Sequence, residues 1–310
     1  MRGRHGYSPP VSRPKKVDDR SPRSPDRATL PAWLLEAAPA GLRSATPARW
    51  GFRHETWIVA AGDERLVLQR RTDGSDPTMA PHVAIRELVR ETGLPVPEPV
   101  RVASSSGVIV VLPYVDGVVA ADLLRGGSGA AIVGRACGMA AARIASINPD
   151  ALAALRTSPA ARTADGLPGR APLPAADGLA DEARRALGRL LRETEAALLA
   201  TPAVVAHGDL VPVNLLLRDD RVAAVLDLDR ARLAHRDYDA AWYAWVVAHH
   251  HPGLIRDAWH GFADAARTPG RSFRDVAWLW PLQLLERVRE ARDDAERAEW
   301  TARLAASLSG

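Results

Sequence analysis

The chain has 310 residues, of which 47% are hydrophobic and 25% are charged, so it can bury a substantial core and form two lobes. No uncharged apolar run reaches the roughly 18 residues that a membrane span needs, and the first thirty residues lack the apolar core of a signal peptide. We therefore expect a cytoplasmic protein without membrane contact. The single cysteine, Cys137, excludes an intrachain disulfide and a multi-cysteine metal site.

The formal net charge of +4 comes from the first 29 residues. This segment holds eight basic and three acidic residues, whereas the remainder holds 33 basic and 34 acidic residues and is nearly neutral. Because it is also rich in Ser, Pro and Arg, we predict a disordered basic tail over residues 1–29. A neutral body disfavours nucleic acid as a partner. The only lysines, Lys15 and Lys16, lie in the tail, so any cation used by the body must be arginine or histidine.

From residue 30 to residue 112 the chain is rich in short β-branched and apolar segments, which are typical of strands. One segment with spaced apolar residues among charged ones, 81–92, predicts a helix that ends before Gly93. These patterns predict a small sheet with one helix. The predicted strands cover 57–60, 65–69, 100–102 and 108–112.

After Gly117 the pattern changes to alanine-rich amphipathic segments, which predict helices. Residues 148–178 are rich in Pro, Ala and Gly and predict a long surface connection. Three short apolar segments predict strands, and a tight turn at Asp219-Asp220 joins the last two. The predicted helices cover 119–124, 130–147, 181–200 and most of 238–308, and the strands cover 204–206, 214–218 and 222–226.

The strongest chemical signal is His207-Gly208-Asp209, followed five positions later by Asn214 and, after the predicted hairpin, by Asp227. This spacing matches the catalytic loop and the metal-binding turn of kinases. A carboxylate orients the attacking hydroxyl and accepts its proton, while an amide oxygen and a second carboxylate are hard ligands for Mg²⁺. We therefore predict Asp209 as the catalytic base with His207 ordering its loop, and Asn214 and Asp227 as the magnesium ligands.

With these residues the chain resembles the aminoglycoside phosphotransferase and choline kinase family over most of residues 40–290. His207-Gly208-Asp209 with Asn214 is similar to the family's HGD loop, and the segment around Asp227 is similar to its second aspartate segment. Other segments that resemble the family are Arg86-Glu87-Leu88, Gly93-Leu94-Pro95-Val96-Pro97, Leu112 to Gly117 and Asp237 to Trp242.

The resemblance implies an α+β, two-lobed protein-kinase-like fold, with a small β-rich N-terminal lobe that has one helix and a larger, mostly helical C-terminal lobe. Residues 30–116 would form the nucleotide-binding lobe, and residues 117–310 the catalytic and substrate-binding lobe. The implied donor is ATP, with GTP as an alternative, the implied metal is Mg²⁺, and the implied acceptor is a hydroxyl group of a small molecule. Asp239 is expected to brace the catalytic loop.

The resemblance also implies where the nucleotide binds. Backbone groups near Leu112 and Tyr114 would meet the adenine, and Gly51, in the first hairpin, would cover the phosphates. That hairpin has only one glycine, which is a weak phosphate-binding signal.

The family's third-strand lysine has no counterpart in this chain. We expect Arg70 to take its place as the cation that faces phosphate, with Glu87 on the following helix as its partner. Arg71 or Gln69 would face the site instead if the strand were shifted by one residue, because such a shift exchanges the two faces of a strand.

The sequence does not determine the identity of the phosphate acceptor. An aminoglycoside or a related antibiotic is the first hypothesis, and a sugar, an amino alcohol or another hydroxylated metabolite is the second. Because the third-strand lysine is absent, a catalytically silent nucleotide-binding module is the alternative of a different class.

Overall fold

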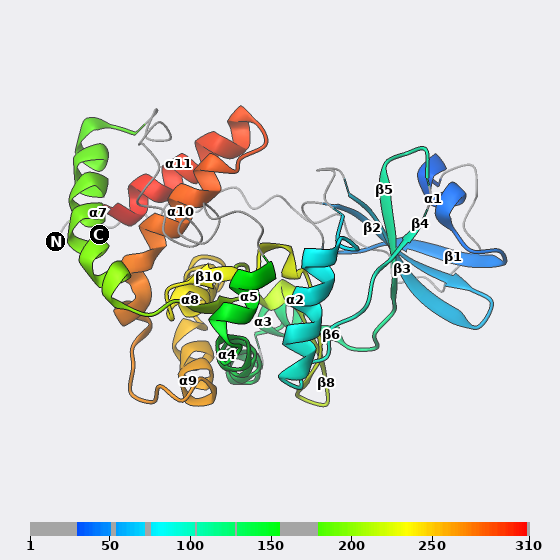
Figure 1. Cartoon of the computed structure of the whole chain (residues 1–310), viewed down its shortest axis with the longest axis horizontal. Coiled ribbons are helices and arrows are strands. Elements are labelled where there is room, and N and C mark those ends of the chain that lie inside the picture. The colour runs from blue at the N-terminus through cyan, green and yellow to red at the C-terminus, as the bar shows by residue number, and fades with distance from the viewer. Residues whose placement is uncertain are drawn as a thin grey trace.

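The protein, seen in a computed structural model, has a β-rich lobe and a larger, mostly helical lobe (Figure 1). No described helix is long and apolar enough to cross a membrane. The predicted tail and most of the predicted connection after residue 148 lie outside the described residues. The structure describes residues 30–50, 54–71, 76–102, 104–127, 129–155 and 179–308.

A five-stranded antiparallel sheet in the order β1-β2-β3-β5-β4 forms the N-terminal lobe. The predicted strands 57–60 and 65–69 are confirmed as parts of β2 and β3, which form a hairpin. Its turn contains Gly62 with a φ of +58°, which a glycine adopts without strain. The first strand of the sheet was not predicted. The strands are β1 (Leu42–Pro47), β2 (His54–Ala61), β3 (Glu64–Arg71), β4 (Val100–Val102) and β5 (Val108–Pro113).

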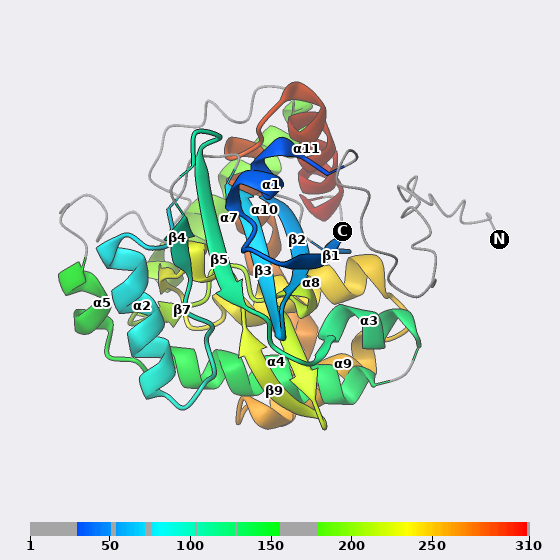
Figure 2. The ribbon, with the colours of Figure 1, turned by 90° about the vertical axis from the view of Figure 1, so that its right-hand side faces the viewer.

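Two helices accompany this sheet within the described residues. The predicted helix is α2 (Ala80–Glu91), which lies beside α5 (Pro149–Leu155) to the left of the sheet in Figure 2 and also contacts the turn after Asp227. The other, α1 (Ala32–Ala37), was missed because six residues are too few to show a helical period. Trp33 and Leu34 are buried against one face of the sheet and hold α1 there, so the prediction of one helix in this lobe was incomplete.

Short strands in the C-terminal lobe hold the predicted catalytic loop. β8 (Leu215–Arg218) and β9 (Arg221–Val225) form the predicted hairpin, and β6 (Val118–Val119) extends it. Asp219 and Asp220 turn the chain with φ values of +52° and +59°, as a type I′ turn requires. β7 (Val204–Ala206) pairs with β10 (Arg232–Ala234), so the segment from β7 to β8 is fixed at both ends.

The predicted helices at 119–124, 130–147 and 181–200 and the predicted helical stretch over most of 238–308 are confirmed. Helix α5 was not among them, because it lies at the start of the segment predicted as a surface connection. Figure 1 shows α7, α10 and α11 grouped at the end of the molecule far from the N-terminal sheet. Three short 3-10 segments, η3 (Pro212–Asn214), η4 (Leu228–Arg230) and η5 (Phe273–Leu279), connect the elements around the site. The helices are α3 (Ala120–Arg125), α4 (Ala130–Ala145), α5 (Pro149–Leu155), α7 (Asp181–Ala200), α8 (Tyr238–His250), α9 (Ile255–Ala265), α10 (Trp280–Arg289) and α11 (Asp294–Leu308).

Glycines set the close packing of α4 against α9 in the main core. A Cβ at Gly134, Gly138 or Gly261 would lie between 1.9 and 2.2 Å from a backbone carbonyl oxygen of the opposite helix. Atoms do not approach that closely, so a side chain at any of these positions would force the two helices apart.

We predict that Gly138→Ala lowers the free energy of unfolding by about 1–3 kcal/mol, because overpacking a tight core costs that much. Gly188→Ala on α7 is the matched control, since its Cβ would meet only the end of the Arg192 side chain at 3.6 Å. In a helix this change should stabilise the protein by about 0.5–1 kcal/mol. Urea unfolding of both variants tests the packing, and a Gly138→Ala protein as stable as the wild type would contradict it.

Candidate active site

The predicted catalytic loop, residues 207–214, connects β7 with β8 and passes close to η4. Gly208 has a φ of +81°, and a Cβ there would lie 2.0 Å from the carbonyl oxygen of Arg230. Only glycine satisfies both conditions. The loop closes in η3, where the Asn214 backbone N–H donates to the Val211 carbonyl over 2.9 Å.

The carboxylate of Asp239, near the start of α8, braces this loop, as the sequence predicted. Its Oδ2 accepts the backbone N–H of His207 at 2.7 Å, and its Oδ1 accepts the backbone N–H of Gly208 at 3.0 Å. Burial raises the pKa of Asp239, while the two backbone N–H groups oppose that shift by stabilising the charged form. Two adjacent backbone amides are thus fixed by one buried side chain.

His207 is fully buried and joins the loop to the turn that carries Asp227. Its Nδ1 accepts the backbone N–H of Asp209 at 3.3 Å, so its Nε2 carries the proton and donates to the Leu226 carbonyl at 3.0 Å. Both ring nitrogens are therefore used within the protein. This arrangement fits a residue that orders the loop and not one that receives a proton from a substrate.

Asp209 receives two hydrogen bonds on the same carboxylate oxygen. Trp242 Nε1 donates to Oδ1 at 2.7 Å, and Arg287 Nη2 donates to Oδ1 at 2.8 Å. Within the described part of the chain, no side chain donates to Oδ2. Burial would raise the pKa of Asp209, but the positive charges of Arg287 and Arg230 outweigh it and hold that pKa below its ordinary value.

Asn214 and Asp227 lie on adjoining segments, as the hairpin predicted. The Asn214 side-chain N–H donates to the Asp209 carbonyl at 2.9 Å, which leaves the amide oxygen available as a ligand. The Leu226 backbone N–H donates to the Asn214 carbonyl at 2.9 Å and holds the two segments together. Asp227 itself has a φ of +55°, a left-handed conformation that turns the chain sharply into η4.

The electrostatics around Asp227 suit a bound cation. Burial and the nearby carboxylates of Asp229 and Asp209 raise the pKa of Asp227, because negative charge is crowded there. Among the described residues, no three His, Cys, Asp or Glu side chains could enclose a metal by themselves. An amide oxygen and one or two carboxylates nevertheless match Mg²⁺, which binds proteins through few side chains together with substrate phosphates and water. The residues present thus fit the metal.

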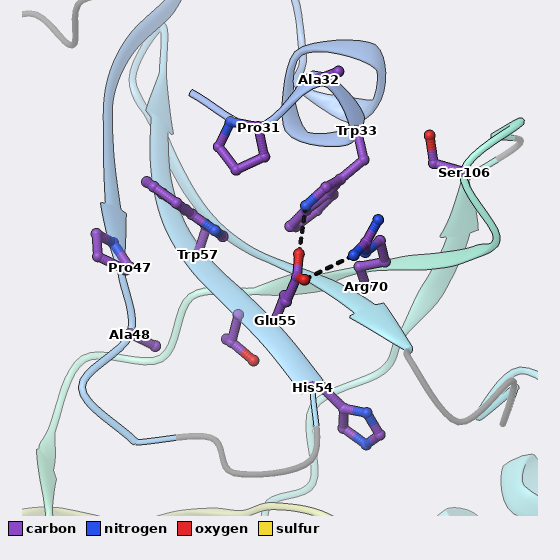
Figure 3. A pocket seen from close by; sticks show the side chains of 11 residues that line it. Pro31, Ala32, Trp33, Pro47, Ala48, His54, Glu55, Trp57, Arg70 and Ser106 are labelled. Atoms are coloured by element: carbon purple, nitrogen blue, oxygen red, sulfur yellow. Dashed lines mark hydrogen bonds and ion pairs between the residues drawn. The ribbon is translucent and has the colours of Figure 1, made fainter. Parts of the chain in front are cut away.

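The register of β3 places Arg70 and Arg71 on opposite faces of the sheet. Arg70 donates to Glu55 at 2.7 Å, on the same side as Trp33 of α1 (Figure 3). Arg71 lies on the other face, is 8% exposed, and forms an ion pair with Asp229 in the C-terminal lobe. Of the three candidates for the missing lysine, the structure therefore brings Arg71, and not Arg70, to the side of the predicted magnesium ligands.

The expected pair between Arg70 and Glu87 does not form. Glu87 lies on the exposed side of α2, because the apolar positions Ile85 and Val89 turn the other side of the helix inward. Arg86 is the buried charged residue of α2, and its guanidinium donates to the Pro77 carbonyl at 2.5 Å. The prediction of this pair was wrong because a strand and a helix were each assigned the wrong face.

The predicted adenine contacts lie at the end of β5. Leu112 pairs with Val67 of β3, and the Tyr114 backbone N–H donates to the Arg65 carbonyl at 3.2 Å. The Arg65 guanidinium also lies over the Tyr114 ring, 3.6 Å from its centroid. Gly51 lies outside the described residues.

Sequence reasoning missed Trp242 and Arg287 as partners of Asp209. Trp242 follows Asp239 by three positions and therefore shares its face of α8, so the helical period carried a signal. Arg287 is 78 positions from Asp209, and only the packing of α10 reveals the contact.

A family model described as the phosphotransferase enzyme family matches residues 44–305. The chain belongs to this family. No curated protein matches the chain.

Among solved structures, this phosphotransferase resembles a thermostable mutant of aminoglycoside phosphotransferase APH(4)-Ia in ternary complex with ADP and hygromycin B, with 15% identity over 89% of this chain and 96% of that chain and a TM-score of 0.63. It resembles the streptomycin-ATP-APH(2")-IIa complex with 14% identity over 90% and 98% of the two chains and a TM-score of 0.57. It also resembles the macrolide 2'-phosphotransferase MphH from Brachybacterium faecium, with 21% identity over 90% of this chain and 98% of that chain and a TM-score of 0.50. These likenesses confirm the predicted two-lobed kinase-like fold, and the family match identifies a phosphotransferase enzyme.

We predict that Arg71→Ala weakens the binding of ATP with magnesium by about tenfold or more, since it removes a buried cation that pairs with Asp229, close to the predicted magnesium ligands. Arg70→Ala, the same change on the neighbouring residue, should alter the affinity by less than about twofold because its partially exposed ion pair lies on the other face. Calorimetric titration of both variants measures this difference. Equal effects of the two changes would contradict the assignment.

Proposed function

We propose that this phosphotransferase transfers the γ-phosphate of ATP, bound with magnesium, to a hydroxyl group of a small molecule. The observation that carries the proposal is the Asp209 carboxylate, which the described side chains hold through Oδ1 alone, beside Asn214 and Asp227. Oδ2 would accept the proton of the acceptor hydroxyl as its oxygen bonds to the γ-phosphorus. The bond between that phosphorus and the bridging oxygen breaks, and ADP leaves.

The remaining residues position charge around this step. Asn214 and Asp227 would hold magnesium, which neutralises phosphate charge when bound. Arg71 would add a cation on the side of the N-terminal lobe, where its Nε is buried and has no hydrogen-bond partner among the described residues. Catalysis would thus consist mainly of positioning and charge neutralisation, with one proton transfer to Asp209.

For the acceptor, we propose an aminoglycoside or a related antibiotic. This is supported by the similar solved structures, which include complexes with hygromycin B and streptomycin and a macrolide phosphotransferase. Because fold similarity does not determine substrate choice, sugars and amino alcohols belong in the same test.

The first experiment measures magnesium-dependent transfer of the γ-phosphate from ATP and GTP to hygromycin B, streptomycin, a macrolide, amino alcohols and sugars. We expect transfer to at least one antibiotic, and its loss by at least about 10³-fold in Asp209→Asn, which keeps the shape of the side chain but not its basicity. Transfer only to a sugar or an amino alcohol would contradict the proposed acceptor. Nucleotide binding without any transfer would favour the catalytically silent module.

A second prediction concerns the metal. Asp227→Asn should weaken magnesium-dependent ATP binding by about tenfold or more, since an anionic ligand becomes neutral. The matched control is Asp220→Asn, the same change at another residue of positive φ, which lies exposed in the β8–β9 turn. Titrating ATP with and without magnesium against both variants provides the test. Unchanged metal dependence in Asp227→Asn would remove Asp227 as a ligand.

A further inference from the structure

Two groups from separate helices, Trp242 and Arg287, meet at one oxygen of Asp209 and form a triangle with it. Trp242 of α8 and Arg287 of α10 both donate to Oδ1, at 2.7 and 2.8 Å. The Arg287 guanidinium also lies over the Trp242 ring, 4.4 Å from its centroid. Each member of this triangle therefore contacts the other two.

The triangle is well shielded from water. The Arg287 side chain is 11% exposed, and Trp242 belongs to a buried cluster with Trp245, Val211 and residues of α7, α10 and α11. Hydrogen bonds to a charged group are stronger and more directional where water is excluded. The ion pair between Arg287 and Asp209 thus differs from an exposed surface pair, which contributes little.

Arg287 is itself held in place from α10. Its second terminal nitrogen lies 3.9 Å from Glu290, and Glu290 forms an ion pair with Arg230 of η4. The guanidinium is therefore fixed by a carboxylate on one side, by the Trp242 ring on its face and by Asp209. α10 thereby connects the segment that follows Asp227 to the carboxylate of the catalytic loop.

This arrangement solves a geometric problem of the proposed reaction. The outer torsion of an aspartate side chain is soft, so a carboxylate with one partner can rotate and exchange its two oxygens. Two donors that reach Oδ1 from different elements fix the plane of the carboxylate. The direction of Oδ2 is then fixed as well. Among the described residues, no side chain donates to Oδ2, so this oxygen is available to a substrate.

We propose that Arg287 is a positioning residue for phosphoryl transfer, which together with Trp242 holds Oδ1 of Asp209 so that Oδ2 faces the acceptor hydroxyl. The inference rests on the proposed role of Asp209 as the base. It adds to the reaction a residue of α10, far in sequence from the catalytic loop and outside the motifs that resemble the family.

Arg303 of α11 provides a matched control for the packing of Arg287. Its guanidinium lies 4.5 Å from the centroid of the Trp300 ring, and it forms an ion pair with Glu299. It therefore has the same kinds of contact, in the same aromatic cluster, but none with Asp209. A purely structural role of Arg287 predicts similar effects of the two alanine substitutions.

The experiment compares Arg287→Ala, Arg287→Lys and Arg303→Ala with the wild type in γ-phosphate transfer from ATP, using as probes water and the acceptors of the antibiotic, amino alcohol and sugar panel. Arg287→Ala should lower kcat about 10²-fold, as small displacements of a reacting group do. The Kd for ATP with magnesium and the KM for the acceptor should stay near those of the wild type, and the protein should remain folded at the assay temperature. Arg287→Lys should recover part of kcat, and so should millimolar guanidinium added to Arg287→Ala. Arg303→Ala should keep the wild-type kcat.

Two outcomes overturn the inference in distinguishable ways. If Asp209→Asn abolishes transfer but Arg287→Ala does not, or if Arg287→Ala loses activity only together with stability and without guanidinium rescue, Arg287 is not a positioning residue. If the wild type transfers phosphate to no probe, or Asp209→Asn retains transfer, the proposed function fails first, and this inference fails with it.

Discussion

The site depends on one buried carboxylate. Asp239 accepts the backbone N–H groups of His207 and Gly208, and these two residues carry the loop to Asp209. His207 connects the loop to the segment that carries Asp227, because its ring bonds both the Asp209 amide and the Leu226 carbonyl. A carboxylate placed where water is excluded is costly unless it is fully hydrogen-bonded, so the loop and Asp239 stabilise each other.

Charge then organises the space around this loop. Asp209, Asp227 and Asp229 gather negative charge where a metal and phosphates would bind, and arginines approach it from both lobes. Arg71 reaches Asp229 from the N-terminal sheet, while Arg287 reaches Asp209 from α10. The first pair couples the two lobes, and the second couples the catalytic loop to the helices at the far end of the C-terminal lobe.

Local sequence patterns were sufficient to predict the parts of the site whose residues are close in sequence. The β8–β9 hairpin forces Asn214 and Asp227 together, so their proximity followed from a turn and two short apolar runs. Contacts made through tertiary packing could not be predicted from the sequence. Arg70 was preferred to Arg71 because a strand's pattern does not reveal which face meets the other lobe, and Arg287 was missed because only the packing of α10 brings it to Asp209. Helix α1 and strand β1 were too short or too polar for a periodic signal.

The most direct test of this account is amide hydrogen exchange at His207 and Gly208, measured together with turnover in Asp239→Asn. The amide replaces one acceptor oxygen by an N–H₂ group, so one of the two backbone donors loses its partner. We expect faster exchange at these two amides and a large loss of turnover, with the β8–β9 hairpin and the N-terminal sheet still protected. Unchanged protection at both amides together with normal turnover would contradict the claim that Asp239 holds the catalytic loop.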